Sequence, residues 1–320
     1  MVKKPHSKIL AALLSGALSF SLVACSNDDS SSSSPSSSAS AQADDTGATE
    51  APTVDRDPSG ELPEVTFADG KPTMKTVSAD PPTSISVKTL TEGDGETVQP
   101  GAYVSVNYAG FLWSDGTQFD SSFDRGQSTT FSLNQVVDGW KYGLEGTKVG
   151  DQVLVVVPPE FGYGDTDSGS IPGGSTLVFV VDVLGTLSPT NDALSGATAT
   201  DAELPAGVNV AGDLGAEPTI TFDDGAAAPT ETQTVVLAEG TGAPIADTDT
   251  FVFNGVVGNW GDSATIQSTW PDSYQSGGGV PELSGVKVGS RVLLVYPADE
   301  ASGTKATVMV IDIVGSIPSA

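Results

Sequence analysis

Few residues of this 320-residue chain could act as nucleophiles or proton carriers at neutral pH. There is one cysteine, Cys25, and one histidine, His6, and both lie in a segment with the character of an export signal. Thiol catalysis, histidine catalysis and histidine metal ligation are therefore not expected in the mature protein, and a disulfide within it is impossible. Aromatic side chains and carboxylates remain to form a site.

The start of the chain has the features of a bacterial lipoprotein signal peptide over residues 1–24. Lysines precede an apolar run at residues 9–23, which is short for a membrane span. Leu22-Val23-Ala24-Cys25 resembles the cleavage site at which such signals are cut and lipidated. We therefore expect lipidated Cys25 to anchor an extracytoplasmic protein to the cell membrane. The alternative is an ordinary secretory signal followed by an unrelated thiol.

Composition limits the possible partners and marks a linker. With 13 basic and 41 acidic residues the formal net charge is −28, so binding to nucleic acid is not expected. Residues 25–60 are rich in Ser, Ala, Asp, Thr and Pro and hold little that could be buried. We predict a disordered tether with a reach on the order of 30 Å.

Aromatic and acidic residues recur downstream in six short motifs. The motifs are Asn107-Tyr108-Ala109-Gly110, Gln118-Phe119-Asp120-Ser121-Ser122, Val137-Asp138-Gly139-Trp140, Pro158-Pro159-Glu160-Phe161-Gly162-Tyr163-Gly164, Ile171-Pro172 and Thr176-Leu177-Val178-Phe179. Their order and spacing resemble the FKBP family of macrolide-binding prolyl isomerases over about a third of the chain. The resemblance implies peptidyl-prolyl cis-trans isomerase activity that needs no cofactor and no metal.

The resemblance also implies a site. It would be an apolar pocket between a bent antiparallel sheet and one short helix, with Trp140 as its floor. The catalytic residues implied are Tyr108, Phe119, Asp120, Trp140 and Tyr163. The binding residues implied are Arg125, Phe131, Val136, Val137, Ile171 and Phe179. In an arbitrary domain such aromatic residues would simply be core.

Such a pocket suits the chemistry of proline isomerisation. Rotation about an X–Pro bond passes through a twisted amide that has lost its resonance, against a barrier of about 18–20 kcal/mol. An apolar pocket that excludes water favours the less polar twisted state without a nucleophile. The resemblance assigns the N–H of Val137 and the hydroxyl of Tyr163 to substrate carbonyls, and it places Asp120 near the rotating amide, where it orients Tyr108.

Three features of the motifs leave questions open. Asp120 and Arg125 would by default be a turn residue and a surface cation, but in the family arrangement they pair across the pocket mouth. Thr129 stands where many relatives have an aromatic residue, and Ser170 where a relative often has an apolar one. Tight macrolide binding is therefore more doubtful than activity on peptides.

The apolar patterns predict an α+β fold in which strands dominate. Residues 104–108 alternate, and residues 153–157 and 177–184 are buried β-branched runs. A short helix is expected at residues 136–144.

The chain also contains an internal repeat. The paired segments are 63–70 with 218–225, 146–158 with 285–297, and 178–185 with 308–315. We predict two tandem FKBP-like domains, at 61–187 (with an N-terminal extension) and 216–320, with a linker at 188–215. In the second, Gly255, Ile266, Gln267 and Gly279 stand opposite Tyr108, Phe119, Asp120 and Trp140, and Tyr163 has no counterpart. The second domain is therefore expected to be a degenerate copy that cannot isomerise proline.

Three functions remain in competition. The first is an isomerase that acts on proline-containing exported polypeptides, with macrolides as further candidate ligands. The second is a non-catalytic module or chaperone on the cell surface that holds proline-containing chains in the same pocket. The third is a surface protein that uses both halves for adhesion.

Overall fold

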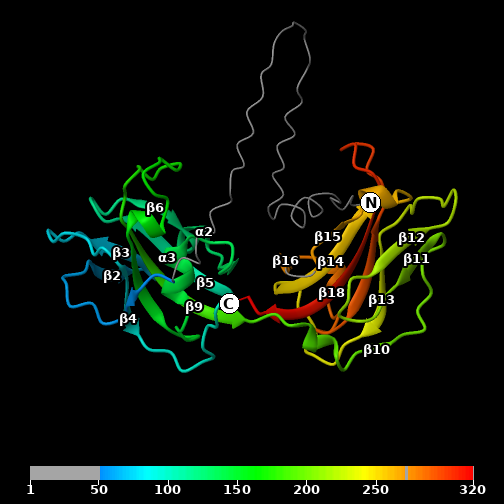
Figure 1. Ribbon diagram of the computed structural model, residues 1–320, viewed down its shortest axis with the longest axis horizontal. Helices are drawn as coiled ribbons and strands as arrows, with labels where there is room; N and C mark the ends of the chain where they lie inside the picture. Colours follow the sequence, from blue (N-terminus) through cyan, green and yellow to red (C-terminus); the bar gives the residue numbers. More distant parts are fainter. Residues whose placement is uncertain (1–50, 271–272, 320) are drawn as a thin grey trace, which may run out of the picture.

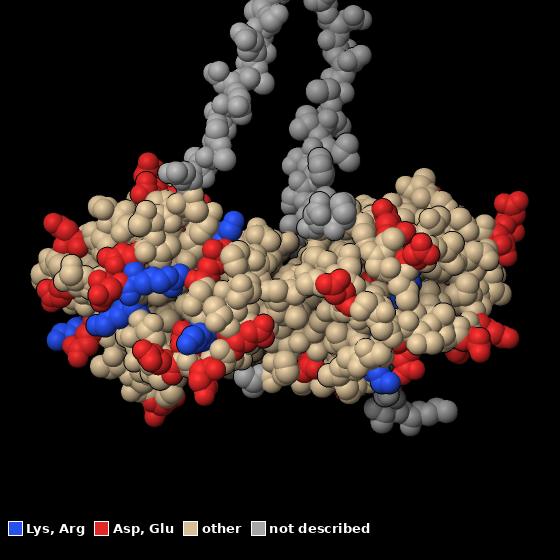
Figure 2. Space-filling view, turned by 60° about the horizontal axis from the view of Figure 1, so that its bottom comes forward, with Lys and Arg blue, Asp and Glu red and all other residues tan. Residues whose placement is uncertain are grey.

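The computed structural model describes residues 51–270 and 273–319, so Cys25, the predicted signal peptide and most of the predicted tether lie outside the described residues. Figure 1 shows two β-rich halves side by side, the first coloured from blue to green and the second from green to red. On the face in Figure 2, acidic side chains are spread over both halves. In the described part of the chain, no helix is long and apolar enough to cross a membrane.

The first half is built on one sheet with the strand order β1-β4-β8-β9-β5-β6, in which β7 also pairs with β5. The strands are β1 (Val54–Asp55), β4 (Ile85–Thr91), β5 (Tyr103–Leu112), β6 (Gln118–Ser121), β7 (Thr129–Ser132), β8 (Gln152–Val157) and β9 (Leu177–Leu187). The helices are α2 (Ser122–Arg125), α3 (Asp138–Leu144) and the 3₁₀ turn η1 (Pro159–Phe161). All pairings are antiparallel except that of β1 with β4. The predicted strands and the helix at 136–144 are confirmed, and the predicted α+β class holds for this half.

Both faces of this sheet are covered. On one face, α3 packs over a core that includes Leu133, Leu144 and Val157. On the other, the hairpin of β2 (Glu64–Ala68) and β3 (Lys71–Lys75) contributes Val65 and Met74 to a second cluster. Because both faces are buried, residues 153–157 of β8 and 177–181 of β9 form continuous valine-rich apolar runs rather than an alternating pattern.

Two glycines allow α3 to lie directly on β8. A Cβ atom added to Gly139 would stand 2.2 Å from Cγ1 of Val157, and one added to Gly143 would stand 2.8 Å from Cγ1 of Val155. Real Cβ atoms do not approach other atoms so closely, so only glycine permits this depth of packing. The helix that carries Trp140 is thereby seated on the sheet.

The second half repeats the same sheet order, β10-β13-β17-β18-β14-β15, with β16 paired to β14. Its strands are β10 (Thr198–Ala199), β11 (Val208–Ala211), β12 (Thr219–Phe222), β13 (Gln233–Glu239), β14 (Thr250–Asn259), β15 (Gln267–Ser268), β16 (Gln275–Gly278), β17 (Arg291–Tyr296) and β18 (Thr307–Ile317). Its described helical elements are the 3₁₀ turns η2 (Asn191–Leu194), η3 (Ser263–Thr265) and η4 (Pro281–Leu283). The turn η4 stands where the first half has α3.

The structure corrects two boundaries. The end of the predicted tether, residues 25–60, is not free chain, because β1 pairs with β4 and Val54 packs against the core. The predicted linker at 188–215 contains η2, β10 and β11, and it buries Leu194 and Val208. A few apolar side chains suffice to order these stretches, although their Ser, Ala, Thr and Gly content resembles that of a linker.

The two halves contact each other at the ends of their longest strands. Leu187 of β9 packs at Gly315 of β18, where an added Cβ would lie 2.5 Å from its Cδ2 atom. In return, Ile317 of β18 packs at Gly185 of β9, where an added Cβ would lie 2.7 Å from its Cγ2 atom. The β5–β9 and β14–β18 registers place these residues at matching positions. The interface is therefore nearly symmetric, with each half presenting a glycine to an aliphatic side chain of the other.

Candidate active site

An aromatic cluster surrounds the buried indole of Trp140. The ring centroids of Tyr108, Phe131 and Phe179 lie 5.2, 5.4 and 5.2 Å from that of Trp140, at interplanar angles of 89°, 70° and 81°. Phe119 extends the cluster, with its ring 5.6 Å from that of Phe179. Such edge-to-face pairs stabilise beyond the area that they bury. Four strands and one helix thus bring together aromatic residues that are up to 71 positions apart in sequence, Tyr108 to Phe179.

The strand pattern explains this convergence. Side chains at alternate positions of β5 point to the same face, so Val106 and Tyr108 lie on the side that α3 covers. Gly110 is the next position on that face, and a Cβ there would stand 2.5 Å from Cζ of Phe119. Glycine at the end of the Asn-Tyr-Ala-Gly motif is therefore what allows the Phe119 ring to enter the cluster.

A polar group borders the aromatic cluster. The hydroxyl of Tyr108 donates to Oδ2 of Asp120, and Nη1 of Arg125 forms an ion pair with Oδ1. Nη2 of Arg125 donates to Tyr108 Oη at 3.0 Å, and the guanidinium carbon stands 5.5 Å from the Tyr108 ring centroid. The backbone N–H of Ser121 donates to Oδ1 at 2.8 Å. The pair of Asp120 and Arg125, left open by the sequence, is therefore formed.

These contacts fix the protonation states. Burial acts to raise the pKa of Asp120, but the hydrogen bonds from Tyr108 and Arg125 outweigh it, so the pKa lies below its usual value. Burial raises the pKa of Tyr108, and its hydrogen bond to Asp120 raises it further. At neutral pH Asp120 is therefore ionised and Tyr108 keeps its proton.

The short helix α2 positions Arg125. Ser121 caps its start by accepting a hydrogen bond from the backbone N–H of Asp124 at 3.2 Å, and Gly126 ends it with a φ of 68°. Ser122 is fully buried, and its hydroxyl accepts from the backbone N–H of Tyr108 at 2.8 Å. Ser122 belongs to the motif Gln118-Phe119-Asp120-Ser121-Ser122, but the sequence indicated no role for it. The structure shows that it begins α2 and bonds to the strand that carries Tyr108.

The other expected site residues lie in the same region, except for Tyr163, which was expected to be catalytic. Val136, Val137 and Phe131 are half-buried against the core that contains Trp140, and Ile171 is buried in it. Tyr163 stands apart, 46% exposed, in the loop after η1. The structure thus groups ten of the eleven expected site residues and leaves Tyr163 at the surface of the loop.

The second half lacks this cluster. The strand register sets Gly255 opposite Ile311 as Tyr108 is opposite Val181, in agreement with the sequence alignment of the repeats. Phe251 and Phe253 are buried in its core, whereas the first half has valines at the matching positions. Larger residues on the strand thus fill volume where η4 replaces the longer helix.

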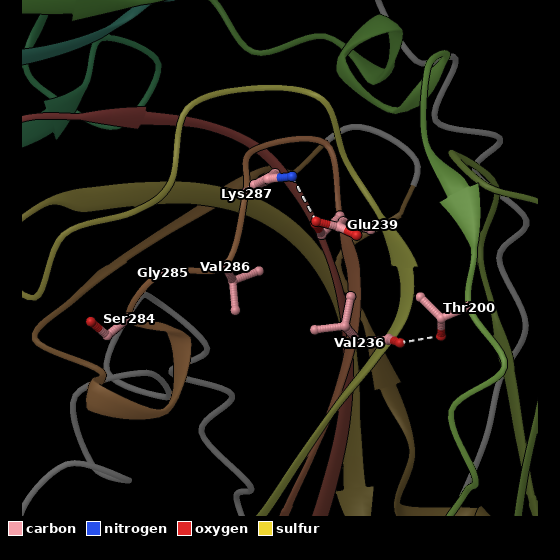
Figure 3. A pocket seen from close by; sticks show the side chains of 8 residues that line it. Thr200, Val236, Glu239, Ser284, Gly285, Val286 and Lys287 are labelled. Atoms are coloured by element: carbon pink, nitrogen blue, oxygen red, sulfur yellow. Dashed lines mark hydrogen bonds and ion pairs between the residues drawn. The ribbon is translucent and has the colours of Figure 1, made fainter.

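Two shallow cavities lie in the second half, away from Trp140. One of about 330 Å³ is lined by Thr200, Val236, Glu239, Ser284, Gly285, Val286, Lys287 and Ser290, and the ion pair of Lys287 with Glu239, 2.6 Å long, crosses it (Figure 3). The other, of about 380 Å³, has Leu204, Val210 and Arg291 in its lining. Neither has the aromatic walls of the Trp140 region. Among the described residues, no cluster of His, Cys, Asp and Glu could hold a metal ion.

Comparison with known proteins agrees with this geometry. A family described as FKBP-type peptidyl-prolyl cis-trans isomerase matches residues 94–184, which contain every residue of the aromatic cluster. A probable FK506-binding protein of Corynebacterium glutamicum is 38% identical over 114 residues, covering 36% of this chain and 97% of that protein. An FK506-binding protein of Streptomyces anulatus is 39% identical over 128 residues, covering 39% of this chain and 96% of that protein.

The matched segment defines the first half as the domain of a prolyl isomerase. The chain belongs to the FKBP-type peptidyl-prolyl cis-trans isomerases and is an enzyme of that class.

Proposed function

We propose that the chain isomerises X–Pro bonds of exported polypeptides outside the cytoplasmic membrane, with the proline ring held against Trp140. The observation that carries this proposal is the set of three rings packed edge-to-face around the buried Trp140 indole. Such walls match the apolar character of a pyrrolidine ring.

The proposed mechanism is stabilisation of the twisted amide. The planar amide is more polar than the twisted one, so transfer from water to an apolar pocket costs the planar state more. Each 1.36 kcal/mol of such differential stabilisation accelerates the reaction about tenfold. Asp120 would not transfer a proton, because its low pKa keeps it ionised and both its oxygens already accept hydrogen bonds. Its proposed role is to hold Tyr108 and Arg125 at the pocket mouth.

Two groups would hold the substrate backbone. The N–H of Val137 lies immediately before α3, where the chain is still extended. The exposed Tyr163 hydroxyl would reach a carbonyl once the substrate covers the loop. Thr129 of β7, paired with Val106 of β5, leaves one wall without an aromatic ring. We therefore propose a pocket that accepts varied peptides and binds macrolides weakly.

The location is part of the proposal. The signal-like start and Cys25 support lipid anchoring, and the Ser-rich stretch that follows supports a tether that holds the enzyme clear of the membrane. Polypeptides emerging across the membrane would then be the clients.

For the second half we propose a degenerate FKBP-like copy that supports the first. Both sheets have the same order, and the indoles of Trp113 and Trp260 donate to Ala79 and Ala226, each 34 residues upstream, at 3.4 and 3.3 Å. The copy packs behind the strands that form the pocket wall. The hydroxyl of Tyr103 on β5 donates to the carbonyl of Tyr274, and the Thr130 hydroxyl on β7 lies 3.3 Å from that of Thr250.

The test is protease-coupled isomerisation of short X–Pro peptides by the chain without residues 1–25. We expect acceleration by the parent protein, a loss of at least tenfold in kcat/KM for Trp140→Ala, and little change for Trp260→Phe in the second half. A folded but inactive parent that still binds proline peptides would support the binding-module alternative instead.

A further inference from the structure

Arg56 lies directly after strand β1, in the stretch whose composition resembles a tether. Strand β1 runs parallel to β4, with Val54 beside Ile85 and Asp55 beside Ser86. From there the exposed Arg56 side chain reaches the end of α3, 86 to 89 residues away in sequence.

The guanidinium binds three backbone carbonyls at the end of that helix. Nη1 donates to Gly143 O at 3.4 Å, and Nη2 donates to Tyr142 O at 3.1 Å and to Glu145 O. The last carbonyls of a helix have no partner within the helix and carry partial negative charge, so a planar cation with several donors suits them.

The remaining carbonyls of this turn are satisfied locally. Lys141 O accepts from the backbone N–H of Glu145 at 3.2 Å, and Leu144 O accepts from the N–H and the hydroxyl of Thr147 at 3.1 and 2.6 Å. With the three bonds from Arg56, every backbone carbonyl from Lys141 to Glu145 accepts a hydrogen bond. Burial lowers the pKa of Arg56 and the nearby Glu145 acts to raise it. The guanidinium stays charged at neutral pH, because arginine is not deprotonated in proteins.

Helix α3 is short and lacks a side-chain cap at its start. It is seven residues long, and its N-cap residue Val137 makes no side-chain capping bond. Isolated helices of this length are unstable in water, so contacts with the rest of the fold must hold it. Those contacts include the core packing of Trp140 and Leu144, the close approach of Gly139 and Gly143 to β8, and the hydrogen bonds from Arg56 to the last turn.

The second half offers a comparison. Leu283 and Gly285 stand in the positions of Leu144 and Gly146, since Gly285 N donates to Ile245 O as Gly146 N donates to Val98 O. There, Ser284 and Gly285 border the open cavity of about 330 Å³ in Figure 3, together with Thr200. Thr200 follows β10, which pairs with β13 antiparallel, whereas β1 pairs with β4 parallel. The arginine contact at this turn is found in the half that contains Trp140.

We propose that Arg56 is a positioning residue for the proline pocket: it ties the last turn of α3 to β1 and so fixes the depth of Trp140 and the direction of the Val137 N–H. This inference rests on the proposed function of the Trp140 pocket. Without this contact α3 can shift. The affinity of the pocket for the planar amide and for the twisted amide then falls by similar factors. KM therefore rises while kcat changes little.

The experiment measures kcat and KM on X–Pro peptides for the chain without residues 1–25, carrying Arg56→Ala or Arg56→Lys. We expect about a fivefold to tenfold rise in KM for Arg56→Ala, with kcat within twofold, and partial recovery of KM on adding guanidinium chloride at tens of millimolar. Arg56→Lys should keep the raised KM, because a single ammonium group lacks the planar set of donors with which the guanidinium contacts three carbonyls. Lys75→Ala removes an equivalent charge from an exposed site on the same N-terminal stretch and serves as the control.

Three outcomes would overturn the proposal. The first is Arg56→Ala with unchanged KM. The second is a loss of kcat that follows the unfolded fraction seen by circular dichroism. The third is a loss that guanidinium does not relieve while Arg56→Lys behaves as the parent. Failure of the pocket assignment itself would appear separately, as an inactive parent or as an active Trp140→Ala variant.

Discussion

At the scale of the residue, Asp120 is held as an ionised carboxylate by the hydrogen-bond donors around it. Its oxygens accept from Tyr108, Arg125 and Ser121, so the charge is spread over donors that it also positions. An ionised acid next to a neutral phenol gives the pocket mouth a fixed polarity across the physiological range.

This arrangement predicts a flat pH profile. The pKa of Asp120 is lowered and that of Tyr108 is raised, so neither group should titrate between about pH 5 and about pH 9, given reference values near 3.9 and 10. We expect kcat/KM to be constant over that interval and to fall only below about pH 4, where Asp120 takes up a proton. A lowered folded-state pKa also means that ionised Asp120 stabilises the fold above its unfolded pKa, and this contribution is lost as pH falls through the folded value.

The measurement is kcat/KM and thermal melting from pH 3.5 to 9, with Asp120→Asn as the comparison. The variant should lose several-fold in kcat/KM at pH 7 and lose the acid limb of the profile. A titration of the parent's activity near pH 6 to 7 would contradict the assignment, because no described group of the pocket is expected to titrate there.

The sequence predicted the residues of the cluster well and their supports poorly. Tyr108, Phe119, Trp140 and Phe179 meet as the motifs implied, because strand alternation and one helix turn decide where such side chains point. Arg56 could not be found in this way. Its partners are backbone carbonyls, which leave no sequence signal, and it lies in a stretch whose composition resembles disordered chain.

At the scale of the element, α3 depends on glycine. A methyl group at Gly139 would meet Val157 at 2.2 Å, and the fully buried strand β8 has little room to yield. Overpacking of this kind costs about 1–3 kcal/mol, of which alanine's better helix propensity returns up to about 1 kcal/mol.

Gly139→Ala should therefore lower the free energy of unfolding by about 1–2 kcal/mol and raise KM, since the helix must move away from the sheet. Urea unfolding followed by circular dichroism gives the first quantity. Gly60→Ala is the control, because an added Cβ there has no atom within 4 Å. Equal stability of the two variants would show that α3 has more freedom than its packing indicates.

The second half has its own buried element, the ion pair of Arg291 on β17 with Asp312 on β18. The side chains are 3% and 0% exposed, and Nε and Nη2 donate to the two carboxylate oxygens at 2.6 and 2.8 Å. Arg291 also donates to the carbonyls of Gly212 and Ala216, at 2.9 and 2.7 Å. The Arg291 guanidinium thus bonds the loop at the end of the predicted linker to the sheet.

Arg291→Ala leaves the Asp312 carboxylate buried without its partner, so we expect a loss of about 3–5 kcal/mol in unfolding free energy. The matching position in the first half supplies the control. There Gln152 donates to Asp182 at 2.8 Å, and Asp182 is less buried, so Gln152→Ala should cost about 1 kcal/mol. Urea unfolding of both variants measures the two losses in unfolding free energy. If the losses are similar, the buried ion pair contributes no more than the part-buried hydrogen bond of Gln152.

At the scale of the whole molecule, the near symmetry of the interface explains why two halves with different pockets remain joined. Leu187 packs at Gly315 and Ile317 packs at Gly185, around a shared apolar cluster that also holds Tyr103 and Val252. Each half contributes both a glycine and an aliphatic side chain to these contacts, so the second half packs against the first although it lacks the aromatic cluster. The sequence revealed the repeat but not this docking, because the contacts involve single residues at strand ends.

Breaking this interface should separate the unfolding of the two halves. Domains joined by a well-packed apolar interface unfold together, whereas loosely joined domains unfold independently. We expect one calorimetric transition for the chain without residues 1–25 and two for Gly185→Leu/Gly315→Leu, because each leucine occupies the space of the opposing aliphatic side chain. The exposed Ser188→Leu on the same segment is the control.

Since Tyr103 and Thr130 would lose their partners behind the pocket wall, kcat/KM of the double variant should fall up to about threefold while Trp140 remains in place. Two transitions already present in the parent would mean that the second half gives the first no support, and the pocket would then owe its rigidity to α3, Arg56 and β8 alone.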